Sequence, residues 1–246
     1  MIALILVLGA VVGSFLNLLI HRVPRREDIC FKRSYCPCCT HALGPLQLIP
    51  VVSFCAQKGR CVWCQNPISK RYVWVELATS VLFGFCWLNF GASLMTLKLV
   101  MFFSAMIALF AIDLKESLLP DAFTLPLIIS GLGLGLWEYR FFDSLEGMLV
   151  GYVSYYSVGF LAKLYYKKDA IGGGDLKLGA AIGAFWGFHI AVESVYLSFV
   201  VGGLAGVLLL VFKLKKKTDA VPFGPAMIMA CGISVMWGEP IWNYFF

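Results

Sequence analysis

The sequence predicts an all-α polytopic membrane protein with about eight transmembrane helices and a small cytoplasmic, cysteine-rich segment after the first helix. Hydrophobic residues make up 60% of the 246 residues and charged residues only 14%, which excludes an ordinary soluble domain. A membrane-spanning helix needs about 20 predominantly apolar residues. Runs of this kind lie at residues 1–20, 73–90, 94–112, 122–138, 146–166, 176–190, 191–212 and 222–240.

The basic residues predict the orientation of these helices. Nothing basic precedes the first run and Arg22 follows it, so we expect an uncleaved anchor with its N-terminus outside. If the runs alternate in direction, all Lys and Arg residues except Lys98 and Arg140 fall on one side. Basic residues collect on the cytoplasmic side. The net charge of +6 therefore reflects topology, with a lipid bilayer and no nucleic acid as partner.

The segment after the first run carries two C-x-x-C pairs, Cys36 to Cys39 and Cys61 to Cys64, with 21 residues between them. This spacing is typical of a structural zinc site made of four thiolates. We expect zinc to be bound by Cys36, Cys39, Cys61 and Cys64. Cys38 could replace Cys39, and Cys30 and Cys55 lie nearby. Disulfides are disfavoured because the cytoplasm is reducing, and zinc would stabilise a segment with little apolar core.

Two aspartates stand at the ends of apolar runs. Asp113 closes the run 94–112, and Asp175 follows the glycines at 172–174. Charge within hydrocarbon costs a few kcal/mol, so such acids are functional candidates. Two runs separate the aspartates, which places both on the cytoplasmic side, where they can meet. Paired carboxylates that share a proton are the machinery of aspartic proteases. We expect Asp175, near a helix N-terminus, to activate water and Asp113 to act as the acid.

The surrounding residues have simpler interpretations. We expect Asp121 to cap the following helix, and Glu116 and Asp169 to be solvated loop acids. The glycines at 172–174 are expected to permit close approach and positive φ angles. Small residues further along would let the next helix pack closely on a neighbour: Gly179, Ala180, Gly183 and Ala184. A transporter with broken helices and intramembrane acids is the competing class of function.

Several motifs together carry a family resemblance over nearly the whole chain. Besides the paired C-x-x-C segment, they are Gly13-Ser14-Phe15-Leu16-Asn17, Arg22-Val23-Pro24, Ser69-Lys70-Arg71-Tyr72, Val75-Glu76-Leu77, Asp113 with Leu118-Leu119-Pro120-Asp121, Gly172-Gly173-Gly174-Asp175-Leu176-Lys177-Leu178, and Pro222-Phe223-Gly224-Pro225. In these motifs the chain resembles the bacterial type IV prepilin peptidases, enzymes of the inner membrane.

The resemblance implies a function and a set of roles. Asp113 and Asp175 would be the catalytic pair, acting on the cytoplasmic leader of prepilins or pseudopilins. Many members also methylate the new N-terminal amine with S-adenosylmethionine, so this cofactor is implied by resemblance alone. Glu76 is a candidate residue for the methyl-transfer activity, or it forms an ion pair with Lys70 or Arg71 at the interface. We therefore predict a first transmembrane helix at 1–20, a cytoplasmic zinc-binding domain at 21–72 and a membrane-embedded aspartic protease domain at 73–246.

Overall fold

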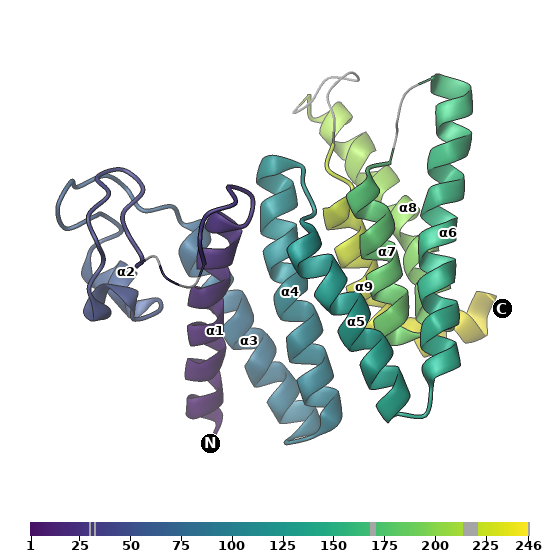
Figure 1. Ribbon diagram of the computed structural model, residues 1–246, viewed down its shortest axis with the longest axis horizontal. Helices are drawn as coiled ribbons and strands as arrows, with labels where there is room; N and C mark the ends of the chain where they lie inside the picture. The colour runs from purple at the N-terminus through teal and green to yellow at the C-terminus, as the bar shows by residue number, and fades with distance from the viewer. Residues whose placement is uncertain (30, 32, 168–170, 214–220, 246) are drawn as a thin grey trace. The chain divides into compact units, whose positions relative to one another are not determined.

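The computed structural model of the protein describes residues 1–29, 31, 33–167, 171–213 and 221–245 (Figure 1). The predicted residues Cys30 and Asp169 lie outside this set. The chain forms two compact units, Met1–Ala111 and Ile112–Phe246.

The described residues form helices and no β-strand, as predicted. The elements are α1 (Ile2–Arg22), the 3-10 helix η1 (Pro45–Leu48), α2 (Val52–Ala56), α3 (Arg71–Phe90), α4 (Leu94–Glu116), α5 (Asp121–Trp137), α6 (Phe141–Tyr166), α7 (Gly173–Trp186), α8 (Phe188–Val211) and α9 (Gly224–Phe245). In the described part of the chain, α1, α3, α4 and α8 are long and apolar enough to cross a membrane. Each of the eight predicted runs overlaps a helix, but α7 has only 14 residues and, of the described helices, only these four meet the length and hydropathy of a span, so the count of eight is approximate.

One predicted boundary was wrong. The sixth and seventh runs were divided after residue 190, but α7 ends at Trp186 and α8 begins at Phe188. Gly187 lies between them with a φ of 86°, which glycine adopts without the penalty of a Cβ. Its amide caps α7 by donating to the Gly183 carbonyl at 2.8 Å. The chain therefore turns earlier than the hydrophobicity suggests.

In the first unit, α1 packs along α3 (Figure 1). Two glycines of α1 permit this approach. A Cβ added to Gly9 would lie 2.8 Å from the Cα of Ser80, and one added to Gly13 would lie 2.7 Å from the Cα of Glu76. Ser80 also donates its hydroxyl to the Leu6 carbonyl at 2.8 Å. Small residues let the two backbones meet, as in other membrane helix pairs.

In the second unit, α7 packs against α5, α6, α8 and α9, and its residues from Leu178 to Trp186 are all buried. The small residues that were expected to allow close packing do so. Gly179 and Gly183 lie against the backbone of α6 at Gly151 and Gly147, and Ala184 lies against Gly131 of α5. A larger side chain at these glycines would separate the helices.

Candidate active site and metal centre

The four predicted cysteines lie together in the first unit. The sulfur atoms of Cys36, Cys39, Cys61 and Cys64 are all within 4.8 Å of one another. Two zinc-bound thiolates lie about 3.8 Å apart in a tetrahedron with Zn–S bonds of ~2.3 Å, and the Sγ atoms of Cys36 and Cys64 are 3.9 Å apart. Cys38, the predicted substitute for Cys39, is exposed and outside this cluster. The cluster therefore has the donors and the size to bind a metal ion.

Two turns with the same backbone geometry build the cluster. In the first, the Cys36 amide donates to the His41 carbonyl at 2.9 Å, and the Thr40 amide donates to the Cys36 carbonyl at 2.8 Å. The second turn repeats both bonds, from Cys61 to Asn66 and from Gln65 to Cys61, each at 3.0 Å. Thr40 and Gln65 occupy equivalent left-handed positions, with φ angles of 57° and 56°. Each C-x-x-C pair is thus positioned by its own turn.

The second turn also favours a thiolate. Hydrogen bonds from the backbone of Cys64 and then of Trp63 lower the pKa of Cys61 to about 7. At Cys64 the Asn66 backbone acts in the same direction, but desolvation and the neighbouring thiols outweigh it and raise the pKa to about 12. Without a cation, the cluster thus keeps protons among its sulfurs. A bound metal ion would replace those protons, because thiolates are its ligands.

The two aspartates occupy the helix ends that the sequence predicts. Asp113 lies in the last turn of α4, and Asp175 is the third residue of α7. Asp113 is buried, and its Oδ2 accepts the Gly224 amide of α9 at 3.0 Å. Asp175 is half-buried, and its Oδ2 accepts the Gly172 amide at 2.9 Å. A backbone N–H therefore fixes the orientation of each carboxylate.

The second unit brings these carboxylates together. Asp113 and Asp175 interact electrostatically, and both neighbourhoods share Leu119. A Cβ at Gly174 would lie 2.8 Å from the Leu119 Cβ, and one at Gly224 would lie 3.2 Å from its Cδ2. Close approach is thus why glycine is needed at these two positions. The expected positive φ angles at 172–174 were wrong, because the positive-φ glycines of the described chain are at 59, 91 and 187.

Three aromatic rings pack together beside the aspartates. Tyr155 of α6, Phe199 of α8 and Phe223 have ring centroids 5.4 to 6.1 Å apart. The Tyr155 hydroxyl shares a hydrogen bond with the Ser198 hydroxyl at 2.9 Å. Phe223 precedes Gly224, so this packing holds the segment whose amide binds Asp113. The motif at 222–225 is one of those that carry the family resemblance, and no role was predicted for it.

Asp121 does not cap its helix as expected. Pro120 is the N-cap of α5, and Asp121 is the first helical residue. Its carboxylate binds the ammonium of Lys177 at 2.6 and 2.8 Å, because α5 and α7 pack together and bring the two side chains within reach. Glu116 is exposed, as expected, and pairs with Lys115 at 2.7 Å, but it is the last residue of α4 and not part of a loop.

Glu76 is buried in α3, and its Oε2 accepts the Val51 amide at 2.8 Å. Within the described residues it forms no ion pair with Lys70 or Arg71, the alternative partners considered above. The Nε of Arg71 is buried without a hydrogen-bond partner there. Glu76 therefore binds the backbone of the cysteine-rich segment and not a neighbouring cation.

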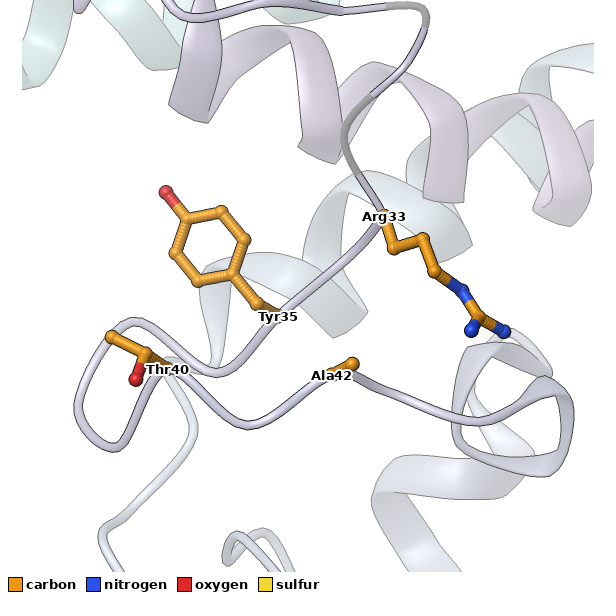
Figure 2. Close-up of a pocket in the computed structure, with 4 residues that line it drawn as sticks. All are labelled: Arg33, Tyr35, Thr40 and Ala42. Atoms are coloured by element: carbon orange, nitrogen blue, oxygen red, sulfur yellow. The ribbon is translucent and has the colours of Figure 1, made fainter.

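A small cavity of about 250 Å³ lies beside the first cysteine turn. It is lined by Arg33, Tyr35, Thr40 and Ala42. Figure 2 shows the Tyr35 ring and the Arg33 guanidinium extending in different directions from one backbone segment. Cofactor pockets usually measure about 300–1,000 Å³. The cavity is small for a nucleoside-sized methyl donor, and we assign no ligand to it.

Two family models match the chain. The Bacterial Peptidase A24 N-terminal domain matches residues 7–90, and the Type IV leader peptidase family matches residues 100–207. Among similar proteins is the prepilin leader peptidase/N-methyltransferase of Stutzerimonas stutzeri, 35% identical over 96% of this chain and 90% of the relative. That of Pseudomonas aeruginosa gives the same values. That of Aeromonas hydrophila is 33% identical over 99% and 93%. No solved structure matches.

Proposed function

The chain belongs to the type IV leader peptidase family, and we propose that it is an aspartic endopeptidase of the bacterial inner membrane. Its substrates are prepilins or pseudopilins, from which it removes the leader peptide. The observation that supports this proposal is that Asp113 and Asp175, on different helices, have neighbouring glycines that both approach Leu119, and that the two carboxylates are close enough to interact electrostatically. Two carboxylates at one site share a proton, which supplies the acid and the base that peptide hydrolysis needs.

The proposed roles follow from the helix ends. Asp175 lies at the N-terminus of α7, where the helix dipole favours the ionised form by about 0.3–1 kcal/mol. It takes a proton from the attacking water. Asp113 lies at the C-terminal end of α4, where the dipole favours the protonated form, and it donates to the carbonyl oxygen. The tetrahedral intermediate then breaks its C–N bond as the leaving amine receives a proton from the pair.

The active site is proposed to face the cytoplasm. The support is the charge asymmetry of the loops, in which Lys98 and Arg140 alone fall on the opposite side. This orientation matches a leader peptide that remains in the cytoplasm. The division into a first helix at 1–20, a zinc-binding domain at 21–72 and a protease domain at 73–246 is part of the same proposal.

A second activity is N-methylation of the newly exposed amine, with S-adenosylmethionine as the methyl-donating co-substrate. The names of the relatives support this proposal. Zinc is proposed as the metal at Cys36, Cys39, Cys61 and Cys64, because four thiolates in a tetrahedron favour it. The zinc has a structural role, since four protein ligands leave no open position for substrate.

Coexpression with a prepilin tests the proposed function. A shortened pilin should appear on a gel, and mass spectrometry should locate the new N-terminus and the added methyl group. Substitution of both aspartates by asparagine is the matched control. Unprocessed prepilin in the presence of folded, membrane-inserted protein would contradict peptidase activity and would favour the transporter alternative.

A further inference from the structure

Ser14, Asn17 and Glu76 form a polar seam between α1 and α3. Ser14 and Asn17 lie about one turn apart on α1 and so share a face. The Ser14 side chain lies beside the Glu76 carboxylate, and the close approach at Gly13 brings α1 against the Cα of Glu76. Asn17 donates its side-chain amide to the Tyr72 carbonyl at 2.9 Å, one turn before Glu76. These polar contacts thus link α1 and α3 where the two apolar helices lie side by side.

The seam presents one unsatisfied acceptor and, beside it, a buried carboxylate. Asn17 is 1% exposed, and its Oδ1 is buried without a hydrogen-bond partner. Its Nδ2 already bonds Tyr72, so the free atom is the oxygen. Glu76 adds a buried carboxylate that takes part in no ion pair with the described residues. An acid within an apolar helix marks a functional site by default. A negative charge beside a free amide oxygen is complementary to a cation that carries N–H donors.

The carboxylate of Glu76 is also held in a fixed orientation. Val51 has a φ of 61° and a ψ of −50°, and the Val52 amide donates to the Pro50 carbonyl at 2.5 Å. This is a γ-turn with positive φ, a strained conformation, especially for a β-branched residue. The Val51 amide points to the Glu76 Oε2 at 2.8 Å. Such strain persists where the surroundings enforce it, and it gathers at functional sites.

We propose that this seam binds the N-terminal ammonium of the cleaved substrate and that Glu76 accepts a proton from it before methyl transfer. The proposal rests on the N-methylation included in the proposed function. Loss of one proton to Glu76 leaves a neutral amine with a free electron pair. That pair forms the C–N bond as the C–S bond of the sulfonium donor breaks, and the sulfur keeps the bonding electrons. The product is an N-methylammonium, so charge and atoms balance.

Glu76→Gln is the principal test. Glutamine keeps the shape and an acceptor for the Val51 amide, but it is neither charged nor able to take the proton. Leader cleavage should stay within about twofold of wild type while the rate of methylation falls at least ~100-fold, the usual effect of losing a general base. Glu146→Gln, at an exposed position of α6, is the matched control and should change neither rate.

A binding measurement tests the seam without methyl transfer. The probe is a peptide with the mature pilin N-terminus, compared with its N-acetylated form, bound to detergent-solubilised protein. Wild type should bind the free amine more tightly. Glu76→Gln and Asn17→Leu should remove that preference while the zinc content stays unchanged. This result would separate ammonium binding from a purely structural role.

The outcomes are distinct from failure of the proposed function. If wild-type protein does not cleave prepilin, the peptidase assignment is wrong. The peptide-binding measurement needs no cleavage, so it tests the seam independently of that result. Normal methylation by Glu76→Gln overturns the role of the seam. Loss of zinc, cleavage and methylation together in both variants would show that Glu76 only braces the cysteine-rich segment, which also overturns it.

Discussion

The cysteine cluster and the aspartate site reach their geometry by opposite routes. Each pair of cysteines is positioned by one short turn, and the two turns repeat the same hydrogen bonds and the same left-handed residue. The aspartate site joins the ends of different helices. Asp113 and the glycine that binds it, Gly224, are 111 positions apart. One site is local in the sequence and the other depends on the packing of a whole helical unit.

This difference predicts how each site fails. The cysteine segment has little apolar core, so its stability depends on the metal. The aspartate site is held by glycine contacts between buried helices, which cannot relax without moving backbone. Changes at the metal should therefore unfold a segment while the carboxylates stay in place. Changes at the helix contacts should disable the carboxylates while the metal stays bound.

Asp113→Asn and Asp175→Asn are expected to have the largest effects. An amide keeps the shape but cannot share the proton or activate water, so each should reduce cleavage at least ~1,000-fold. Initial rates on a purified prepilin measure this loss, and zinc content should be unchanged. Asp121→Asn is the control, because Asp121 pairs with exposed Lys177 and such pairs contribute at most about 1 kcal/mol. Near-normal cleavage by either variant would refute the pair.

Replacing Cys36 and Cys64 together by serine should abolish metal binding. Each turn loses one thiolate, and two remaining sulfurs do not complete a tetrahedron. Metal analysis should fall from about one zinc per chain to near zero, and limited proteolysis should cut between residues 23 and 70. Cys38→Ser is the control, since Cys38 is exposed and outside the cluster. Full zinc content in the double variant would reject these ligands.

Gly224→Ala should impair the aspartate site alone. Its Cβ would lie 2.6 Å from the Oδ2 of Asp113 and 3.1 Å from the Cγ, so the carboxylate or the start of α9 must move. A shift of this size is expected to reduce kcat by about 10- to 100-fold. Gly203→Ala is the matched control, because a Cβ there meets nothing within 4 Å. Equal kcat values for the two variants would show that the close contact of Gly224 with Asp113 does not constrain the carboxylate.

Acidification should separate the two sites by their pH dependence. The pKa of Cys61 is lowered to about 7. Its thiolate therefore stabilises the folded cluster fully at a pH above the ordinary thiol pKa. This stabilisation is lost as the pH falls through about 7. Bound zinc moves the loss to lower pH, because protons must compete with the metal for the thiolates. Cleavage should follow a bell-shaped profile of its own, set by the coupled aspartates. Identical midpoints for zinc release and cleavage would argue against separate sites.

The smallest effect is expected within the cysteine turns. Thr40 and Gln65 both have positive φ angles, which glycine adopts without strain. Thr40→Gly should stabilise the segment by about 0.5–1 kcal/mol, and Gln65→Gly by less, because the branched threonine is the more strained. The midpoint of zinc removal by a chelator measures both. A destabilising effect of both substitutions would show that the side chains themselves contribute to the cluster.

The sequence located most of the fold because apolar runs of membrane length identify helices directly. It failed at Gly187, where a positive φ ends a helix inside a continuous apolar stretch. It also failed at Asp121, which lies at a helix start as expected but binds Lys177. The two errors have different causes. A local backbone conformation ends α7 at Gly187, and a neighbouring helix supplies the partner of Asp121; hydrophobicity records neither.

The cysteines and the two aspartates were found in the sequence because their chemistry carries a pattern. Thiolates at metal-ligand spacing need only short turns to converge, and an acid beside an apolar run stands out by its charge. Tertiary structure alone supplied Gly224 as the donor to Asp113, Leu119 as the residue shared by both aspartates, and the contact of Glu76 with Val51. Those contacts join segments far apart in the chain. Only the packing of helices decides them, since glycine and leucine carry no chemistry that marks them in advance.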